Sequence, residues 1–411
     1  MFLRRVLVLF FYVMALSSLF LLVTTSAAQT ADPREVIKAE ASYDFGKVLR
    51  FNLLVKSDQE VTGGVVKING SDLDSEAVVP LRVSEIEPGL FELKTAIDLK
   101  SVALRAFSLV HYTFEYSLAD GSEVPGKDLA FVYQDDRFEW QQTGSGPIRI
   151  SWYTGDEAQA GRLQLIAQQS LASIHDLLGL EAPANLDIYV YNSKEDLLDA
   201  LPQTGQDWTG GYVDAVAGVL LVSLPSGTEQ SLQAEQQLPH ELMHLVLARQ
   251  AGKAHTPFPA WLEEGLASAV EYFPNADFSF VLQKAVRNGN LLEIPDLCTT
   301  LPRDPANAFL AYAQSASFVQ YLLTRYEASG MRRLVAAYST GLDCETGVRF
   351  ALGSSLHTLE RQWRHQELGE NITKTTAIKL GPWLLFLMAM IILPLLGILI
   401  SSRQRRKEEH Q

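Results

Sequence analysis

The chain has 411 residues, of which 47% are hydrophobic, and a formal net charge of -14 at pH 7. This length and composition fit one large or two ordinary globular domains and exclude a disordered polymer. The acidic balance comes without a basic block inside the globular part. We therefore expect no nucleic acid partner, because phosphate binding needs clustered Lys and Arg.

The N-terminal segment has the pattern of a signal peptide over residues 1–28. An apolar run over 6–23 follows two arginines, and Ser26 and Ala28 supply the small residues that signal peptidase needs. We expect cleavage after Ala28. The alternative is an uncleaved N-terminal anchor, because the apolar run is long for a signal peptide.

Residues 33–140 show the two-residue period of strands. In "LVHYTFEYS" the apolar Val110, Tyr112, Phe114 and Tyr116 alternate with polar residues, and turn signals such as "ADGSE" separate the runs. This pattern predicts an antiparallel β-sandwich domain. Such modules more often dock or bind than catalyse.

The period changes after residue 147, where strands and helices begin to alternate. We expect strands over 148–153, 186–191 and 218–224, and helices over 160–178 and 192–201. A second domain over 147–365 therefore has a small sheet followed by a mainly helical half. The predicted fold class of the whole chain is α+β.

Two histidines and a glutamate interrupt the apolar stretch "LPHELMHLVLARQ" at 238–250. On a helix, His240 and His244 lie one turn apart and present their imidazoles to one point. Glu241 projects about 100° around the axis and can reach a water bound to the same ion. This HExxH pattern predicts two zinc ligands and a general base. The alternative is a buried helix whose histidines bond to carbonyl groups.

A third ligand is predicted in "PFPAWLEEGLASAVEYF" at 257–273. The 19 residues between His244 and Glu264 allow the first helix to end, the chain to turn, and a second helix to return a carboxylate to the metal. A His, His, Glu set that leaves a position for water has the open geometry of a catalytic zinc site.

The sequence "HELMH" followed by "WLEEGLA" resembles the gluzincin metallopeptidases, the peptidase MA-like superfamily that includes thermolysin and the M1 aminopeptidases. The resemblance covers about 150–365 and implies a zincin-like domain. It also implies that Zn2+ is bound by His240, His244 and Glu264, with Glu241 as the base. Glu263 stands where many members have Asn, so either adjacent acid remains a candidate ligand.

The resemblance implies further site residues. The segment 311–330 looks like the helix on which M1-type members carry a tyrosine that donates to the tetrahedral intermediate, and Tyr312 is the candidate. The alternative is that Tyr312 is an aromatic residue that only packs against its neighbours. Glu271 either orients a zinc-bound histidine or is a solvated helix charge. The strand region 210–222 would border the cleft, where an extended peptide pairs with its edge.

Two features depart from the family pattern. Pro239 directly precedes the first histidine, and proline is tolerated only in the first turn of a helix. The helix therefore begins near 235–237 or is kinked at this point. The chain also lacks the "GAMEN" type of motif that binds a substrate's free amine in M1 aminopeptidases, which weakens an aminopeptidase assignment.

The two cysteines, Cys298 and Cys344, lack the spacing of a metal site. If they pair, the closed loop stabilises the fold by roughly 4 kcal/mol on the chain-entropy model. Two buried thiols are the alternative.

The C-terminal part of the sequence predicts a membrane anchor. A linker over 366–379 precedes 21 residues without a charge at 380–400, about 31 Å as a helix, which matches a bilayer core. A basic tail over 401–411 follows. By the positive-inside rule the tail is cytoplasmic, and the catalytic domain of a single-pass cell-membrane protein is extracytoplasmic.

The sequence thus favours a membrane-anchored extracytoplasmic zinc metallopeptidase that acts on a peptide or protein substrate. Its oligomeric state stays open. A hypothesis from another class is a catalytically inactive zincin-like surface module that binds a partner through its β-sandwich. Peptide turnover separates the two, since metal content does not.

Overall fold

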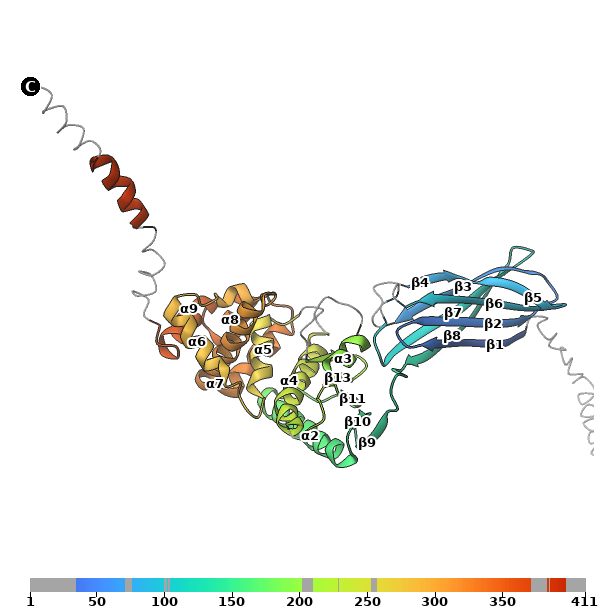
Figure 1. Ribbon diagram of the computed structural model, residues 1–411, viewed down its shortest axis with the longest axis horizontal. Helices are drawn as coiled ribbons and strands as arrows, with labels where there is room; N and C mark the ends of the chain where they lie inside the picture. Colours follow the sequence, from blue (N-terminus) through green and yellow to red (C-terminus); the bar gives the residue numbers. More distant parts are fainter. Residues whose placement is uncertain are drawn as a thin grey trace, which may run out of the picture. The chain divides into compact units, whose positions relative to one another are not determined.

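The structure, a computed structural model, describes residues 35–70, 76–99, 102, 104–201, 210–227, 229–252, 257–370, 383 and 385–396. The predicted signal peptide, most of the predicted linker and the predicted basic tail lie outside these residues. The chain divides into two compact units (Figure 1). The first unit holds residues up to 104 together with 109–133, and the second unit holds 105–108 and the residues from 134 onward.

The first unit consists of two four-stranded antiparallel sheets. Burial alternates along the strands, and the ring of Phe51 on one sheet packs 5.2 Å from Tyr112 and 6.2 Å from Phe114 on the other. One sheet has the order β1-β2-β6-β5, with β1 Glu35–Asp44, β2 Val48–Lys56, β6 Leu90–Asp98 and β5 Arg82–Glu87. The other has the order β4-β3-β7-β8, with β4 Ala77–Pro80, β3 Val61–Gly70, β7 Ser108–Leu118 and β8 Glu123–Tyr133.

The second unit begins with a mixed five-stranded sheet in the order β12-β13-β11-β10-β9. The three inner strands are parallel, whereas β9 and β12 are antiparallel edge strands. The inner strands are rich in Val, Ile and Leu because both faces are covered. The bounds are β9 Gln141–Ser145, β10 Ile148–Trp152, β11 Leu186–Tyr191, β12 Gly211–Asp214 and β13 Val219–Ser223.

Helices make up the rest of the second unit and share one apolar core with the sheet. The side chain of Asp156 caps the start of α2, and Gly179 ends it in the left-handed conformation that glycine adopts without steric cost. The backbone of α7 departs from helical geometry at Glu327. The bounds are α2 Glu157–Leu178, α3 Lys194–Ala200, α4 Gln230–Ala251, α5 Ala260–Ala269, α6 Asp277–Asn288, the 3-10 helix η1 Ile294–Leu297, α7 Pro305–Tyr338, α8 Cys344–Leu352 and α9 Leu356–Gln366.

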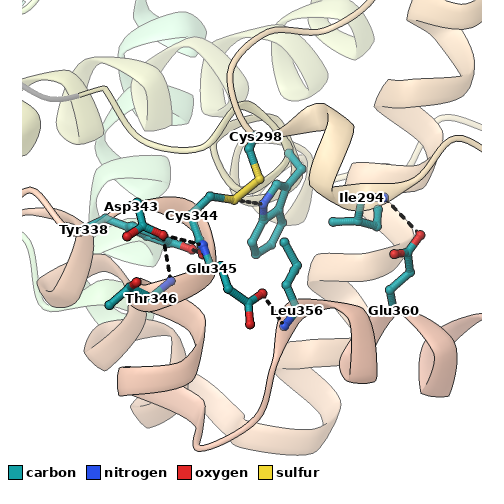
Figure 2. The surroundings of a disulfide bond; sticks show 10 residues. Ile294, Cys298, Tyr338, Asp343, Cys344, Glu345, Thr346, Leu356 and Glu360 are labelled. Carbon is teal, nitrogen blue, oxygen red and sulfur yellow. Dashed lines mark hydrogen bonds between the residues drawn. A yellow bond between two sulfur atoms is a disulfide. The ribbon is translucent and has the colours of Figure 1, made fainter.

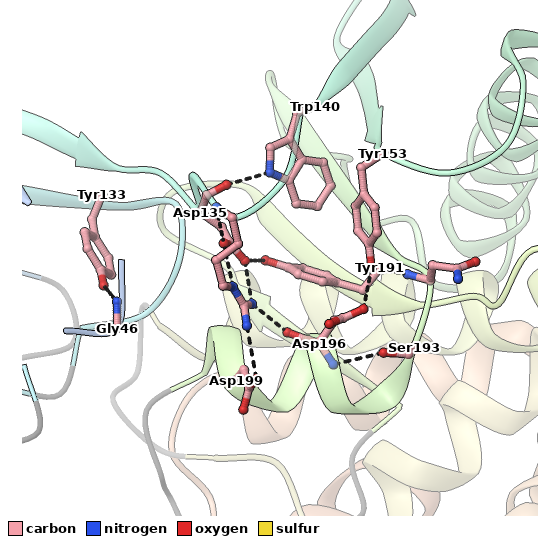
Figure 3. A network of polar contacts seen from close by, with 11 residues as sticks. Gly46, Tyr133, Asp135, Trp140, Tyr153, Tyr191, Ser193, Asp196 and Asp199 are labelled. Atoms are coloured by element: carbon pink, nitrogen blue, oxygen red, sulfur yellow. Dashed lines mark hydrogen bonds and ion pairs between the residues drawn. The ribbon is translucent and has the colours of Figure 1, made fainter. Parts of the chain in front are cut away.

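A buried carboxylate fixes the segment that leads into the second unit (Figure 3). Asp135 is fully buried and accepts hydrogen bonds from Arg137 at 2.7 and 2.8 Å and from the Tyr191 hydroxyl at 3.0 Å. Its backbone oxygen accepts from Trp140 Nε1 at 2.8 Å. Burial first, and then the charge of Asp135, raises the pKa of Tyr191. Because other residues of the protein supply the hydrogen-bond partners of Asp135, we interpret this network as structural.

The predicted transmembrane helix over 380–400 is wrong. Within the part of the chain that the structure describes, no helix has the length and apolar character needed to cross a membrane. The fold class is therefore corrected to α+β with a β-rich first unit and a largely helical second unit.

Candidate metal centre

Helix α4 carries the two histidines and continues through a proline. The helix begins at Gln230, so of the two predicted alternatives the start near 235–237 is wrong. Pro239 cannot donate to the carbonyl of Glu235 one turn earlier. That carbonyl instead accepts the backbone N–H of Tyr272, just beyond α5, at 3.1 Å. The proline therefore frees an acceptor that joins the two helices carrying the predicted ligands.

Three predicted ligands converge where α4 meets α5. Oε2 of Glu264 lies 3.5 Å from Nε2 of His240 and 3.6 Å from Nε2 of His244. The candidate ligand atoms of these three residues all lie within 4.8 Å of one another. Two ligand atoms that each sit about 2.1 Å from a tetrahedral zinc are about 3.4 Å apart. The separations therefore fit a zinc ion between the three side chains.

The hydrogen bonding of Glu264 gives a second test of that fit. Its Oε2 atom is buried and has no hydrogen-bond partner among the described residues. A buried carboxylate oxygen without a donor is destabilising, whereas coordination of a cation satisfies it. The donor set and this orphaned acceptor both suit Zn2+.

The other imidazole nitrogens face two further carboxylates. Nδ1 of His240 lies 2.8 Å from Oε1 of Glu271, and Nδ1 of His244 lies 3.1 Å from Oε1 of Glu263. Such contacts orient an imidazole and direct its second nitrogen toward a metal. Of the two adjacent acids, Glu264 thus faces the Nε2 atoms and Glu263 an Nδ1 atom.

The contact of Glu263 with His244 was missed in the sequence. A signal was present, because neighbouring residues on a helix point about 100° apart and can face two sides of one imidazole. The sequence left Glu271 open between an orienting role and a solvated charge. In the structure its side chain is 8% exposed and contacts His240.

The carboxylates dominate the electrostatics of this cluster. Burial is the largest single influence and favours neutral rings, but Glu264 and Glu271 outweigh it and raise the pKa of His240 to about 9. The pKa of His244 is raised for the same reason by Glu263 and Glu264. Burial disfavours the charge on Glu264, yet the two imidazoles lower its pKa to about 2. Without a metal the cluster therefore pairs an ionised Glu264 with protonated imidazoles, and a bound Zn2+ would displace the protons on their Nε2 atoms.

Glu241 lies against the edge strand β12. A Cβ atom added at Gly211 would come within 2.5 Å of its Cδ, whereas one at Gly210 would stay 4.0 Å from its Oε1. Burial, the largest influence, raises the pKa of the Glu241 carboxyl. Gly211 therefore leaves the space that the predicted base occupies, a role that no local pattern in the sequence indicates.

Helix α7 brings Tyr312 to the same place. Tyr312 lines two cavities together with His240 and Glu241. Burial first, and then the carboxylates of Glu264 and Glu241, raises the pKa of its hydroxyl. The phenol therefore stays protonated at neutral pH and is able to donate a hydrogen bond.

A glycine permits the close approach of α7 to α5. A Cβ atom at Gly265 would lie 2.3 Å from Cγ2 of Val319 and 2.5 Å from the carbonyl oxygen of Ser315. Since Gly265 directly follows Glu264, this contact positions the predicted third ligand relative to the helix of Tyr312.

A disulfide supports the start of α5 (Figure 2). Cys298 and Cys344 are paired, so the alternative of two free thiols is wrong. The carbonyl of Cys298 accepts the backbone N–H of Ala260, and Sγ of Cys344 lies 3.4 Å from Nε1 of Trp261. These contacts hold the first turn of the helix that carries Glu263 and Glu264.

Comparison with known proteins identifies the class of this unit. Residues 166–368 match the family model of the Peptidase MA superfamily. The match confirms the predicted resemblance of this part of the chain to that superfamily. No curated protein matches the sequence.

Several solved structures are similar to this chain at low identity and low TM-score. The M1 zinc metallopeptidase of Deinococcus radiodurans, solved as a mutant, is 13% identical over 81% of this chain and 94% of its own, with a TM-score of 0.34. The aminopeptidase N family protein of Idiomarina loihiensis is 9% identical over 80% of this chain and 73% of its own, with a TM-score of 0.38. OgpA of Akkermansia muciniphila is 18% identical over 24% of this chain, with a TM-score of 0.20, and the match spans only 28% of OgpA.

Proposed function

We propose that the protein is a zinc metallopeptidase that hydrolyses peptide bonds. The observation that carries this proposal is the convergence of the two Nε2 atoms and the orphaned Oε2 of Glu264. His240, His244 and Glu264 would hold Zn2+. When bound, the ion would polarise a scissile carbonyl and lower the pKa of a coordinated water.

The remaining chemistry belongs to side chains of the chain itself. Glu241 accepts the proton of the attacking water and passes it to the leaving amine. Burial, the largest influence, raises the pKa of this carboxyl above its ordinary value. Tyr312 donates to the oxygen on which negative charge develops. Glu271 and Glu263 orient the two imidazoles.

We also propose that this unit works outside the cytoplasm. The disulfide between Cys298 and Cys344 supports this location, because such bonds persist in oxidising compartments and are rare in the cytosol.

The direct test replaces the base and keeps the ligands. Glu241→Gln should retain zinc and lose about 10²–10⁴-fold in peptide turnover, the usual contribution of general acid–base catalysis. The measurement compares peptide hydrolysis and zinc content of the full chain, with and without a chelator. Equal turnover of variant and wild type would remove Glu241 from the mechanism. A zinc-loaded wild type that cleaves no peptide would favour the binding-module hypothesis.

A further inference from the structure

Two cavities meet at the proposed zinc centre. One of about 360 Å³ extends toward α6, and one of about 460 Å³ extends along β12. Both are lined by Gly210, His240, Glu241 and Tyr312. A peptide whose scissile carbonyl lies at these shared residues therefore has space for further residues on both sides.

The carboxylates that line these cavities are already engaged. Glu263, Glu264 and Glu271 each face an imidazole nitrogen of α4. Glu241 is the proposed base, and among the described lining residues there is no further Asp or Glu. Among the described lining residues, the terminal ammonium of a substrate would find no carboxylate that is not already engaged, and an unpaired buried charge is costly. The lining therefore favours cleavage within a chain over removal of its first residue.

The cavity toward α6 has an aromatic wall. The rings of Phe278 on α6 and Phe309 on α7 lie 5.4 Å apart with an interplanar angle of 63°, and both side chains are half-buried. Gln236, Gln237 and Asn275 line the same cavity. A third ring packs well on such an edge-to-face pair, and apolar area is removed from water when it does so.

The cavity along β12 differs in character. It is lined by Gly211, Tyr212 and Val213 of the edge strand and by Ala248 of α4. Strand edges bind extended main chain through backbone hydrogen bonds. The main chain of a substrate is therefore accommodated along β12, and a large side chain is accommodated toward α6.

We infer that the protein is an endopeptidase that cuts next to a large apolar side chain, preferably an aromatic one, which occupies the cavity walled by Phe278 and Phe309. This inference rests on the proposed hydrolytic function.

The first experiment uses the zinc-loaded full chain and peptides blocked by acetyl and amide groups. The residue on each side of the cleaved bond is varied in turn among Phe, Leu, Ala and Asp. On one side of the cleaved bond, replacing Phe by Ala in the peptide should lower kcat/KM about 10–200-fold, the range that apolar pockets give. Cleavage restricted to peptides with a free amino terminus would overturn the inference. A zinc-loaded chain that cleaves no peptide would overturn the proposed function and this inference with it.

Variants assign the preference to the aromatic wall. Phe309→Ala and Phe278→Ala should each lower the Phe-over-Ala preference about tenfold or more while hydrolysis of the Ala peptide persists. Phe278 also packs on the apolar cluster of Leu282 and Ala285, so its replacement removes core contacts as well. Phe309→Ala is therefore the variant that still tests the wall if Phe278→Ala does not fold. Phe280→Ala is the matched control, since this ring is 62% exposed and outside the cavity lining. Undiminished preference in both wall variants would overturn the assignment.

Binding gives a readout that is independent of turnover. The same blocked peptides are titrated calorimetrically into the zinc-loaded Glu241→Gln variant, where the Phe peptide should bind more tightly than the Ala peptide. The double variant that also carries Phe309→Ala should lose that difference. Equal affinities of the two peptides for the Glu241→Gln variant alone would contradict the inference.

Discussion

The two units of the chain differ in how they place charged side chains. Among the described residues of the first unit, no Asp, Glu, His, Lys or Arg is buried, and its ion pair of Lys67 with Glu115 keeps 36% and 24% of the two side chains exposed. The second unit buries Asp135 and Glu360 almost completely and encloses the cluster around His240. Charges leave water only where partners compensate for their desolvation.

The partners of those buried charges separate structural groups from the proposed site. Asp135 is satisfied by Arg137 and Tyr191, and Glu360 by Arg364 and a backbone N–H. Within the described chain, Oε2 of Glu264 is the one buried carboxylate oxygen without a hydrogen-bond partner. The comparison therefore teaches that a buried carboxylate oxygen without a hydrogen-bond partner, and not burial of charge itself, marks the candidate metal centre.

The largest effect among the following variants is expected where the strand edge touches the proposed base. Gly211→Ala introduces a methyl group that displaces the flexible Glu241 side chain, so kcat should fall about 100-fold while zinc stays bound. Gly161→Ala on α2 is the control and should leave kcat unchanged, because nothing lies within 4 Å of the added methyl group and the residue is outside both cavity linings. Steady-state kinetics and metal analysis test both, and equal losses in the two variants would contradict this account.

A smaller effect is expected for a carboxylate that orients a ligand. Glu271→Ala removes the partner of His240 and should weaken zinc binding about 10–100-fold in a competition with a chelator. The control is Glu181→Ala, which removes the partner of His175 in an exposed pair of the same unit. Unchanged affinity in Glu271→Ala would show that the contact has no orienting role.

The smallest effect is expected in the first unit. The hydrogen bond from Lys67 lowers the pKa of Glu115 below its ordinary value of 4.5. This pair therefore contributes stability above pH 4.5 that is lost as the pH falls through the lowered pKa. The Tm of Glu115→Gln should be slightly below that of wild type at neutral pH, and the difference should vanish in acid. A difference that grows in acid would refute the assigned sign.

Local patterns in the sequence predicted much of the second unit. The end of the predicted helix over 160–178 before Gly179 was recognisable, and the spacing of His240, His244 and the acidic pair at 263–264 was sufficient to predict their convergence. The chemistry of each residue type and the helical period carried these predictions. The roles of these residues as ligands stay predictions.

Long-range contacts could not be predicted in the same way. The carbonyl that Pro239 leaves unpaired finds its donor at Tyr272, and the buried Arg105 pairs with Asp214 at 2.5 Å across 109 positions of sequence. Neither partner is implied by local pattern.

The most direct test of the account is anomalous diffraction at the zinc edge from crystals of the full chain. The account predicts a peak about 2.0–2.2 Å from Nε2 of His240, Nε2 of His244 and a carboxylate oxygen of Glu264. A map without a peak there, or a zinc bound by Glu263 with Glu264 turned away, would contradict it.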